Sequence, residues 1–126
     1  MNARSALARV RGLGAAHDGT AHWWAQRLTA VALIPLSLIF VAVVLAAVGA
    51  DRAAVAAVMA NPLIAVLMLL FIAVSFHHLK LGLQVVIEDY IHHEGVKVAA
   101  LMANVMGCYG LATACVFAVL KLAIAG

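Results

Sequence analysis

Ionisable side chains are concentrated between Phe76 and Gly95, at the end of a strongly apolar run. The stretch reads FHHLKLGLQVVIEDYIHHEG and holds four histidines, a lysine, three carboxylates and a tyrosine. Histidine binds metal and haem iron, and carboxylates and phenols orient or transfer protons. Such groups are costly inside an apolar segment, so they indicate contact with a cofactor, with water or with another polypeptide.

On an α-helix this stretch presents two adjacent polar faces, because each residue turns the helix by about 100°. His78 and Asp89 share one face to within about 20°. Gly82 lies one turn after His78 on that face, and Ser75 lies about one turn before it. The second face holds His77, Lys80, Gln84 and Glu88. We assign the second face to contacts with partner chains or to a proton path.

A histidine flanked by small residues leaves a flat space beside its imidazole, and a haem held axially by histidine needs such a space. From the spacing alone, His78 is either an axial haem ligand or an ordinary hydrogen-bonding group between helices. The histidines outside this apolar segment lie too shallow for the membrane midplane: His17, His22, His92 and His93. We therefore expect this chain to offer one axial ligand and a partner subunit to offer the other.

The composition indicates a membrane protein. Of the 126 residues, 67% are hydrophobic and 10% are charged, against roughly 25% charged residues in an average soluble domain. Three apolar runs predict helices at about 28–50, 62–88 and 96–124, each with the roughly 20 residues that cross a hydrocarbon core. The expected fold is all-α and integral to the membrane, with three transmembrane helices bundled with a partner membrane subunit. We predict a single domain over residues 1–126, with an N-terminal cytoplasmic tail over 1–21.

Lysine and arginine favour one side of this predicted topology. The segment through Arg27 holds four arginines and the link between the second and third helices holds Lys97, whereas the opposite side has Arg52 and Lys121. Cytoplasmic segments carry the excess of basic residues, so we expect a cytoplasmic N-terminus. The formal charge of +3 is small and no basic patch is visible, so we expect no nucleic-acid partner.

Residues at the expected cytoplasmic surface each allow two roles. Tyr90 lies about 18 Å along the helix from His78. It is either an interfacial anchor or a hydrogen-bond donor to a quinone carbonyl, with Asp89 orienting it or relaying protons. The segment HWWAQRLTA opens the first helix, where Arg27 is either a positive-inside anchor or a partner for a buried carboxylate or a haem propionate.

His78, Gly82, Gln84 and the run VVIEDY resemble the signature of the succinate dehydrogenase hydrophobic membrane anchor subunit, the small D-type chain of respiratory complex II. HWWAQRLTA is similar to the segment that opens the first helix in this family. The resemblance spans most of the chain from His22 to Lys97. Its most specific part is a histidine followed eleven and twelve residues later by aspartate and tyrosine.

The resemblance implies a subunit of succinate:ubiquinone oxidoreductase that is not catalytic alone, placed between the tricarboxylic acid cycle and the respiratory chain. Its implied partners are a flavoprotein subunit, an iron–sulfur subunit, a second anchor of cytochrome b type and membrane lipid. Haem b would be shared with the second anchor, with His78 as axial iron ligand and Arg27 near the propionates. Tyr90 and Asp89 would lie at the ubiquinone site. The implied location is the bacterial inner membrane, or the mitochondrial inner membrane if the source is eukaryotic.

Three alternatives stay open. His77 is the alternative axial ligand, and we prefer His78 because it keeps Gly82 and Asp89 on its own face. A fumarate reductase membrane anchor runs similar chemistry in the opposite direction. A small non-redox membrane protein, such as a transporter subunit or an assembly factor, would carry the same apolar helices with histidines that bind no metal.

Overall fold

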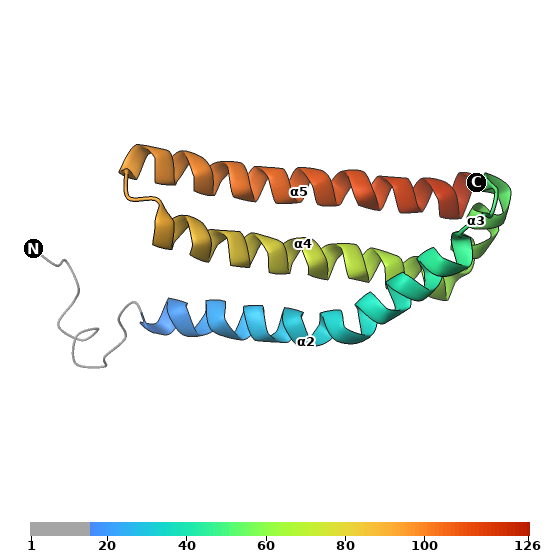
Figure 1. Ribbon diagram of the computed structural model, residues 1–126, viewed down its shortest axis with the longest axis horizontal. Helices are drawn as coiled ribbons and strands as arrows, with labels where there is room; N and C mark the ends of the chain where they lie inside the picture. Colours follow the sequence, from blue (N-terminus) through green and yellow to red (C-terminus); the bar gives the residue numbers. More distant parts are fainter. Residues whose placement is uncertain (1–15) are drawn as a thin grey trace, which may run out of the picture.

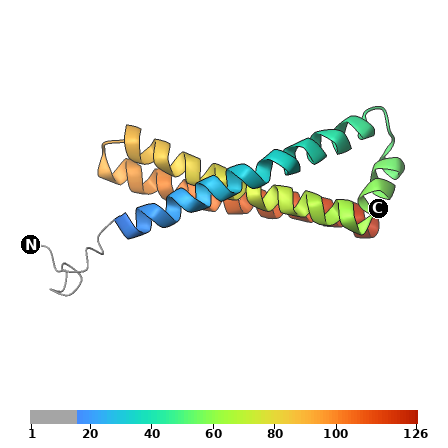
Figure 2. The same cartoon turned by 90° about the horizontal axis from the view of Figure 1, so that it is seen from below.

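The computed structural model describes residues 16–126, and every regular element in that range is a helix. The helices are α2 (Ala16–Ala47), α3 (Arg52–Met59), α4 (Pro62–Tyr90) and α5 (Glu94–Ala125). The long helix α4 lies between α2 and α5 and runs antiparallel to both (Figure 1). Seen from below, α2 crosses the α4–α5 pair at an angle (Figure 2).

All three long helices are long and apolar enough to cross a membrane. This confirms the prediction of an all-α membrane protein with three spans. The first helix differs from the prediction, because it begins at Ala16 rather than near Leu28, so the expected tail over 1–21 is already helical from Ala16. The apolar run predicts only the part of a helix that is suited to lipid. The polar residues before that run belong to the same helix, so α2 begins earlier than predicted. Arg4, Arg9 and Arg11, which contribute to the orientation argument, lie outside the described residues.

The link between the first two spans also contains more structure than expected, since part of it forms α3. Asp51 caps this helix by accepting a hydrogen bond from the backbone N–H of Ala54 at 2.8 Å, as N-terminal capping residues do. Asn61 caps α4 in the same way, and Pro62 occupies its first turn, where a missing N–H costs nothing. Pro35 lies inside α2, and the second half of α2 departs from the direction of the first (Figure 1).

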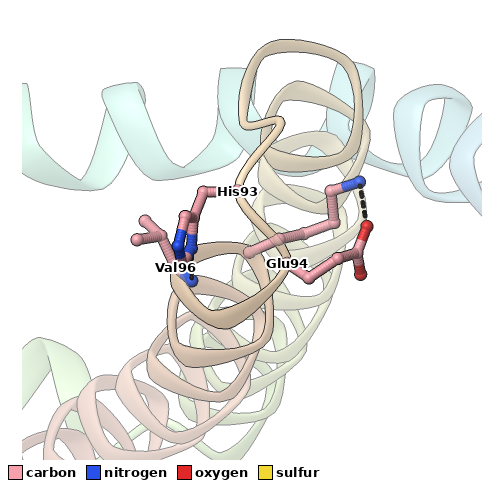
Figure 3. Close-up of polar contacts among 4 residues, drawn as sticks. His93, Glu94 and Val96 are labelled. Carbon is pink, nitrogen blue, oxygen red and sulfur yellow. Dashed lines mark hydrogen bonds and ion pairs between the residues drawn. The ribbon is translucent and has the colours of Figure 1, made fainter.

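The link between α4 and α5 is very short, and His93 has a structural role in it. Its side chain caps α5 by accepting from the backbone N–H of Val96, next to Glu94 (Figure 3). The Glu94 carboxylate lies 3.6 Å from the ammonium group of Lys97. This tight turn leaves three residues between the exposed Tyr90 and the start of α5.

Little of the chain is buried within the three-helix layer. Among the residues with described side chains, the buried apolar ones are Leu36, Met68, Leu81 and Cys108, and Asn104 is the buried polar one. Large apolar side chains are exposed along the outer faces of α2, α4 and α5. These faces are suited to contact with lipid or with another membrane chain.

Candidate functional site

His78 lies near the middle of α4 and is turned toward α2. Its Nδ1 atom is 2.9 Å from the hydroxyl oxygen of Thr29, and the contact is partly buried. The hydroxyl of Thr29 also lies 2.7 Å from the carbonyl oxygen of Ala25 and 3.0 Å from that of Gln26. This polar contact therefore joins α2 to α4 near the middle of α4.

The two small residues predicted to leave a flat space beside His78 lie next to different neighbours. Gln26 of α2 covers Gly82, because a Cβ atom added at Gly82 would lie 3.5 Å from the Gln26 side-chain nitrogen. Ser75 lines a separate apolar groove, together with Phe40 and Met59. The helical-face argument placed both residues correctly along α4, but it did not include α2, which packs over this face.

The other ring nitrogen of His78, Nε2, makes no hydrogen bond to any described residue. Across residues 19–126 no three His, Cys, Asp or Glu side chains gather closely enough to hold a metal ion. Haem iron makes a smaller demand on the protein, because the porphyrin supplies four ligands and each axial position needs one side chain. His78 fits that demand, with one ring nitrogen held and the other available.

His77 faces the other side of α4. Its exposed side chain lines a groove of about 420 Å³ between α4 and α5, together with Lys80 and Tyr109. Lys80 Nζ donates a long hydrogen bond of 3.4 Å to the Tyr109 hydroxyl and lies 5.2 Å from the centre of its ring. The two adjacent histidines therefore serve different helix interfaces.

The remaining residues of the second polar face lie apart from that groove. The Gln84 amide donates to the Glu88 carboxylate at 3.1 Å, and both line a polar pocket with His22 from the start of α2. Two buried atoms on this side of α2, His22 Nε2 and Gln26 Oε1, have no hydrogen-bond partner among the described residues. Buried polar atoms are normally paired, so this interface retains unused hydrogen-bonding capacity.

The predicted quinone-site and propionate residues lie away from His78. Asp89 and Tyr90 occupy the last turn of α4, where both are exposed, and Tyr90 is 78% exposed. The Arg27 guanidinium lies 5.5 Å from the centre of the Trp23 ring and is exposed. Arg27 projects about 200° around α2 from Thr29, so the structure pairs His78 with Thr29 and not with Arg27.

The chain matches the model of the family described as succinate dehydrogenase/fumarate reductase transmembrane subunit over residues 1–120. It belongs to this family. It is 34% identical over 113 residues to the succinate dehydrogenase hydrophobic membrane anchor subunit of Paracoccus denitrificans, covering 90% of this chain and 87% of that one. It is also 34% identical over 88 residues to the anchor subunit of the same name from Rickettsia bellii, covering 70% of each.

A more distant relative is the succinate dehydrogenase membrane anchor subunit of Reclinomonas americana, at 26% identity over 87 residues, 67% of this chain and 72% of that one. No solved structure matches the chain. The resemblance predicted from VVIEDY and HWWAQRLTA is confirmed, and with three spans this member of the anchor family is a multi-pass membrane protein.

Sequence reasoning missed Asn104, which joins the two best-packed helices of this anchor. Its buried amide nitrogen donates to the backbone carbonyl of Lys80 at 2.9 Å, and its amide oxygen lies 3.4 Å from the Cys108 sulfur. The sequence did contain a signal, because Asn104 is the one amide side chain in the third apolar run. Amide side chains in such runs often form hydrogen bonds between membrane helices. Thr29 was missed because its importance depends on the residue opposite it.

Replacing Asn104 by leucine should weaken the α4–α5 interface by about 1 kcal/mol, within the range of interhelical hydrogen bonds in membranes. The measurement is the free energy of unfolding in mixed micelles as denaturing detergent is increased. Thr113→Val is the control, because Thr113 is exposed on the same helix and its hydroxyl donates to its own backbone at Tyr109. Equal stability of both variants and the unaltered chain would show that the Asn104 bond does not stabilise the pair.

Proposed function

We propose that this protein is a membrane anchor subunit of succinate:ubiquinone oxidoreductase, complex II. In this role it forms one domain over residues 1–126, pairs with a second anchor of cytochrome b type, and holds the flavoprotein and iron–sulfur subunits at the membrane. One observation carries the proposal beyond family membership: a mid-span histidine has Nδ1 held by a neighbouring helix and Nε2 without a hydrogen bond among the described residues.

In this proposal His78 would hold haem b through Nε2, together with a ligand from the second anchor. When bound, haem b supplies a one-electron redox centre within the membrane. The assignment of Arg27 to a haem propionate rests on the two donors that a guanidinium presents to a carboxylate, although Arg27 lies on the face of α2 turned away from Thr29 and His78. Its contact with Trp23 holds the exposed Arg27 side chain near the start of the span.

Ubiquinone reduction is assigned to the end of α4. The Tyr90 phenol donates a hydrogen bond to a quinone carbonyl and stabilises the negative charge that develops on that oxygen. Asp89 orients this group or relays protons arriving from the cytoplasmic side. Both side chains are exposed, and neither is hydrogen-bonded to a described residue, so both are free to meet a substrate or a partner chain.

The excess of basic residues on one side favours a cytoplasmic N-terminus in the bacterial inner membrane, or the equivalent orientation in the mitochondrial inner membrane. A fumarate reductase anchor is the second candidate, because the family description includes both enzymes. The relatives named above are all anchors of succinate dehydrogenase, and this favours the succinate-oxidising direction.

The proposal is tested by purifying this chain with an affinity tag from its own membranes. We expect the flavoprotein, iron–sulfur and second anchor subunits to co-purify with a b-type band in the reduced-minus-oxidised spectrum. The preparation should reduce ubiquinone with succinate faster than it reduces fumarate with a low-potential quinol. A colourless chain without these subunits would support a non-redox membrane protein instead.

A further inference from the structure

Thr29 makes three polar contacts with a single hydroxyl proton. Its oxygen lies 2.7 Å and 3.0 Å from two carbonyl oxygens of its own helix and 2.9 Å from Nδ1 of His78. Carbonyl oxygens only accept hydrogen bonds. The shortest of the three distances, 2.7 Å, is typical of an O–H···O bond and favours the carbonyl of Ala25 as the acceptor of the hydroxyl proton.

The direction of the Thr29–His78 bond follows from that assignment. If its proton is used within α2 in this way, the Thr29 hydroxyl accepts from the imidazole, and Nδ1 of His78 carries the hydrogen. A neutral imidazole has one N–H, so Nε2 keeps its lone pair. A nitrogen that ligates iron must be unprotonated, and the hydrogen bond made by the other ring nitrogen fixes which one that is.

We propose that Thr29 is a positioning residue for His78, holding the imidazole as its Nδ1–H form so that Nε2 is the atom presented to haem iron. This inference rests on the proposed function, since it concerns the same haem. Accepting from Nδ1–H also increases the basicity of the ligand. The bond to the α2 backbone restricts the Thr29 side chain, so the acceptor is in place before haem binds.

A different role would produce the same contact. Polar side chains often join membrane helices by hydrogen bonds that only hold the helices together. In that case losing the hydroxyl would loosen α2 from α4 and lower stability, and it would leave the electronic properties of any haem unchanged. The two roles are separated by measurements on the haem itself.

The experiment compares Thr29→Val with Thr29→Ser in the complete four-subunit complex. Valine matches threonine in shape and removes the oxygen, whereas serine keeps it. Thr113→Val is the matched control, because the exposed Thr113 of α5 makes the same hydroxyl-to-carbonyl bond at 2.8 Å and lines the groove between α4 and α5, away from the His78–Thr29 contact. The haem-free complex is titrated with iron protoporphyrin IX, and the low-spin electron paramagnetic resonance signal and the haem midpoint potential are recorded.

We expect Thr29→Val to weaken haem binding roughly 10- to 100-fold, as loss of a group that orients a metal ligand does. The low-spin signal should shift and the midpoint potential should rise, because a less basic imidazole stabilises ferric iron less. Thr29→Ser should restore all three properties, and Thr113→Val should match the unaltered complex.

The positioning role is overturned if Thr29→Val keeps the affinity, signal and potential of the unaltered complex, or if Thr29→Ser is impaired as strongly as valine. A lower melting temperature with an unchanged haem signal would also overturn it, in favour of helix attachment alone. Failure of the proposed function gives a separate result: the unaltered complex binds no haem, or His78→Ala binds it as well as the unaltered complex does.

Discussion

Replacing His78 by alanine should abolish or strongly reduce the b-type absorption band of the assembled complex. In the proposed haem site one of the two iron ligands is then lost, and no other histidine side chain within residues 19–126 shares the contact of His78 with Thr29. Haem held by one remaining ligand should dissociate during purification or become high-spin. The measurement is haem content per assembled complex, together with the reduced-minus-oxidised spectrum.

His77→Ala is the matched control, because it removes an adjacent imidazole that lines the groove between α4 and α5. We expect this variant to keep the band at its normal position and amplitude. If His77→Ala loses the band and His78→Ala retains it, the axial ligand lies on the α5 side, and the assignment based on helical faces is wrong.

The second large effect is expected at the end of α4. Tyr90→Phe removes one hydroxyl group from an exposed position and should lower succinate-dependent ubiquinone reduction by ~100-fold, the loss typical when one donor to a developing oxyanion is removed. Succinate oxidation with a soluble artificial electron acceptor should stay normal, because that reaction does not require the membrane site. The comparison of the two rates separates quinone chemistry from assembly.

Tyr109→Phe provides the control for a lost phenol, since Tyr109 is also exposed but lies near the middle of α5, where it contacts Lys80. Normal quinone reduction in Tyr109→Phe and a strong loss in Tyr90→Phe would support the assigned site. Normal rates in both variants would leave Tyr90 as an anchor at the membrane interface and would remove it from the quinone site.

The sequence predicted the three spans because apolar composition is sufficient to identify helices that cross lipid. It did not predict where α2 begins, since the polar turns from Ala16 add helix without adding hydrophobicity. It also missed α3, whose alanine-rich turns resemble the rest of the chain in composition. Helix ends depend on caps such as Asp51, and these are weaker signals than a run of apolar residues.

The candidate site was predictable along α4 and not across to α2. Helical periodicity placed His77 and His78 on different faces, and the structure gives each a different neighbouring helix. The residue spacing within one helix does not predict the angle at which a second helix crosses it. The partnership of Thr29 with His78, and the cover that Gln26 gives Gly82, therefore required the packed arrangement.

The scarcity of buried apolar side chains affects how long the chain survives in a cell without a partner. With four such residues among those whose side chains are described, a solitary copy has little internal packing to resist local opening. Proteases that remove unfolded chains act on such openings, whereas binding to a companion stabilises the folded form. We therefore expect the steady amount of this polypeptide to follow the supply of its companion, with surplus copies degraded soon after synthesis.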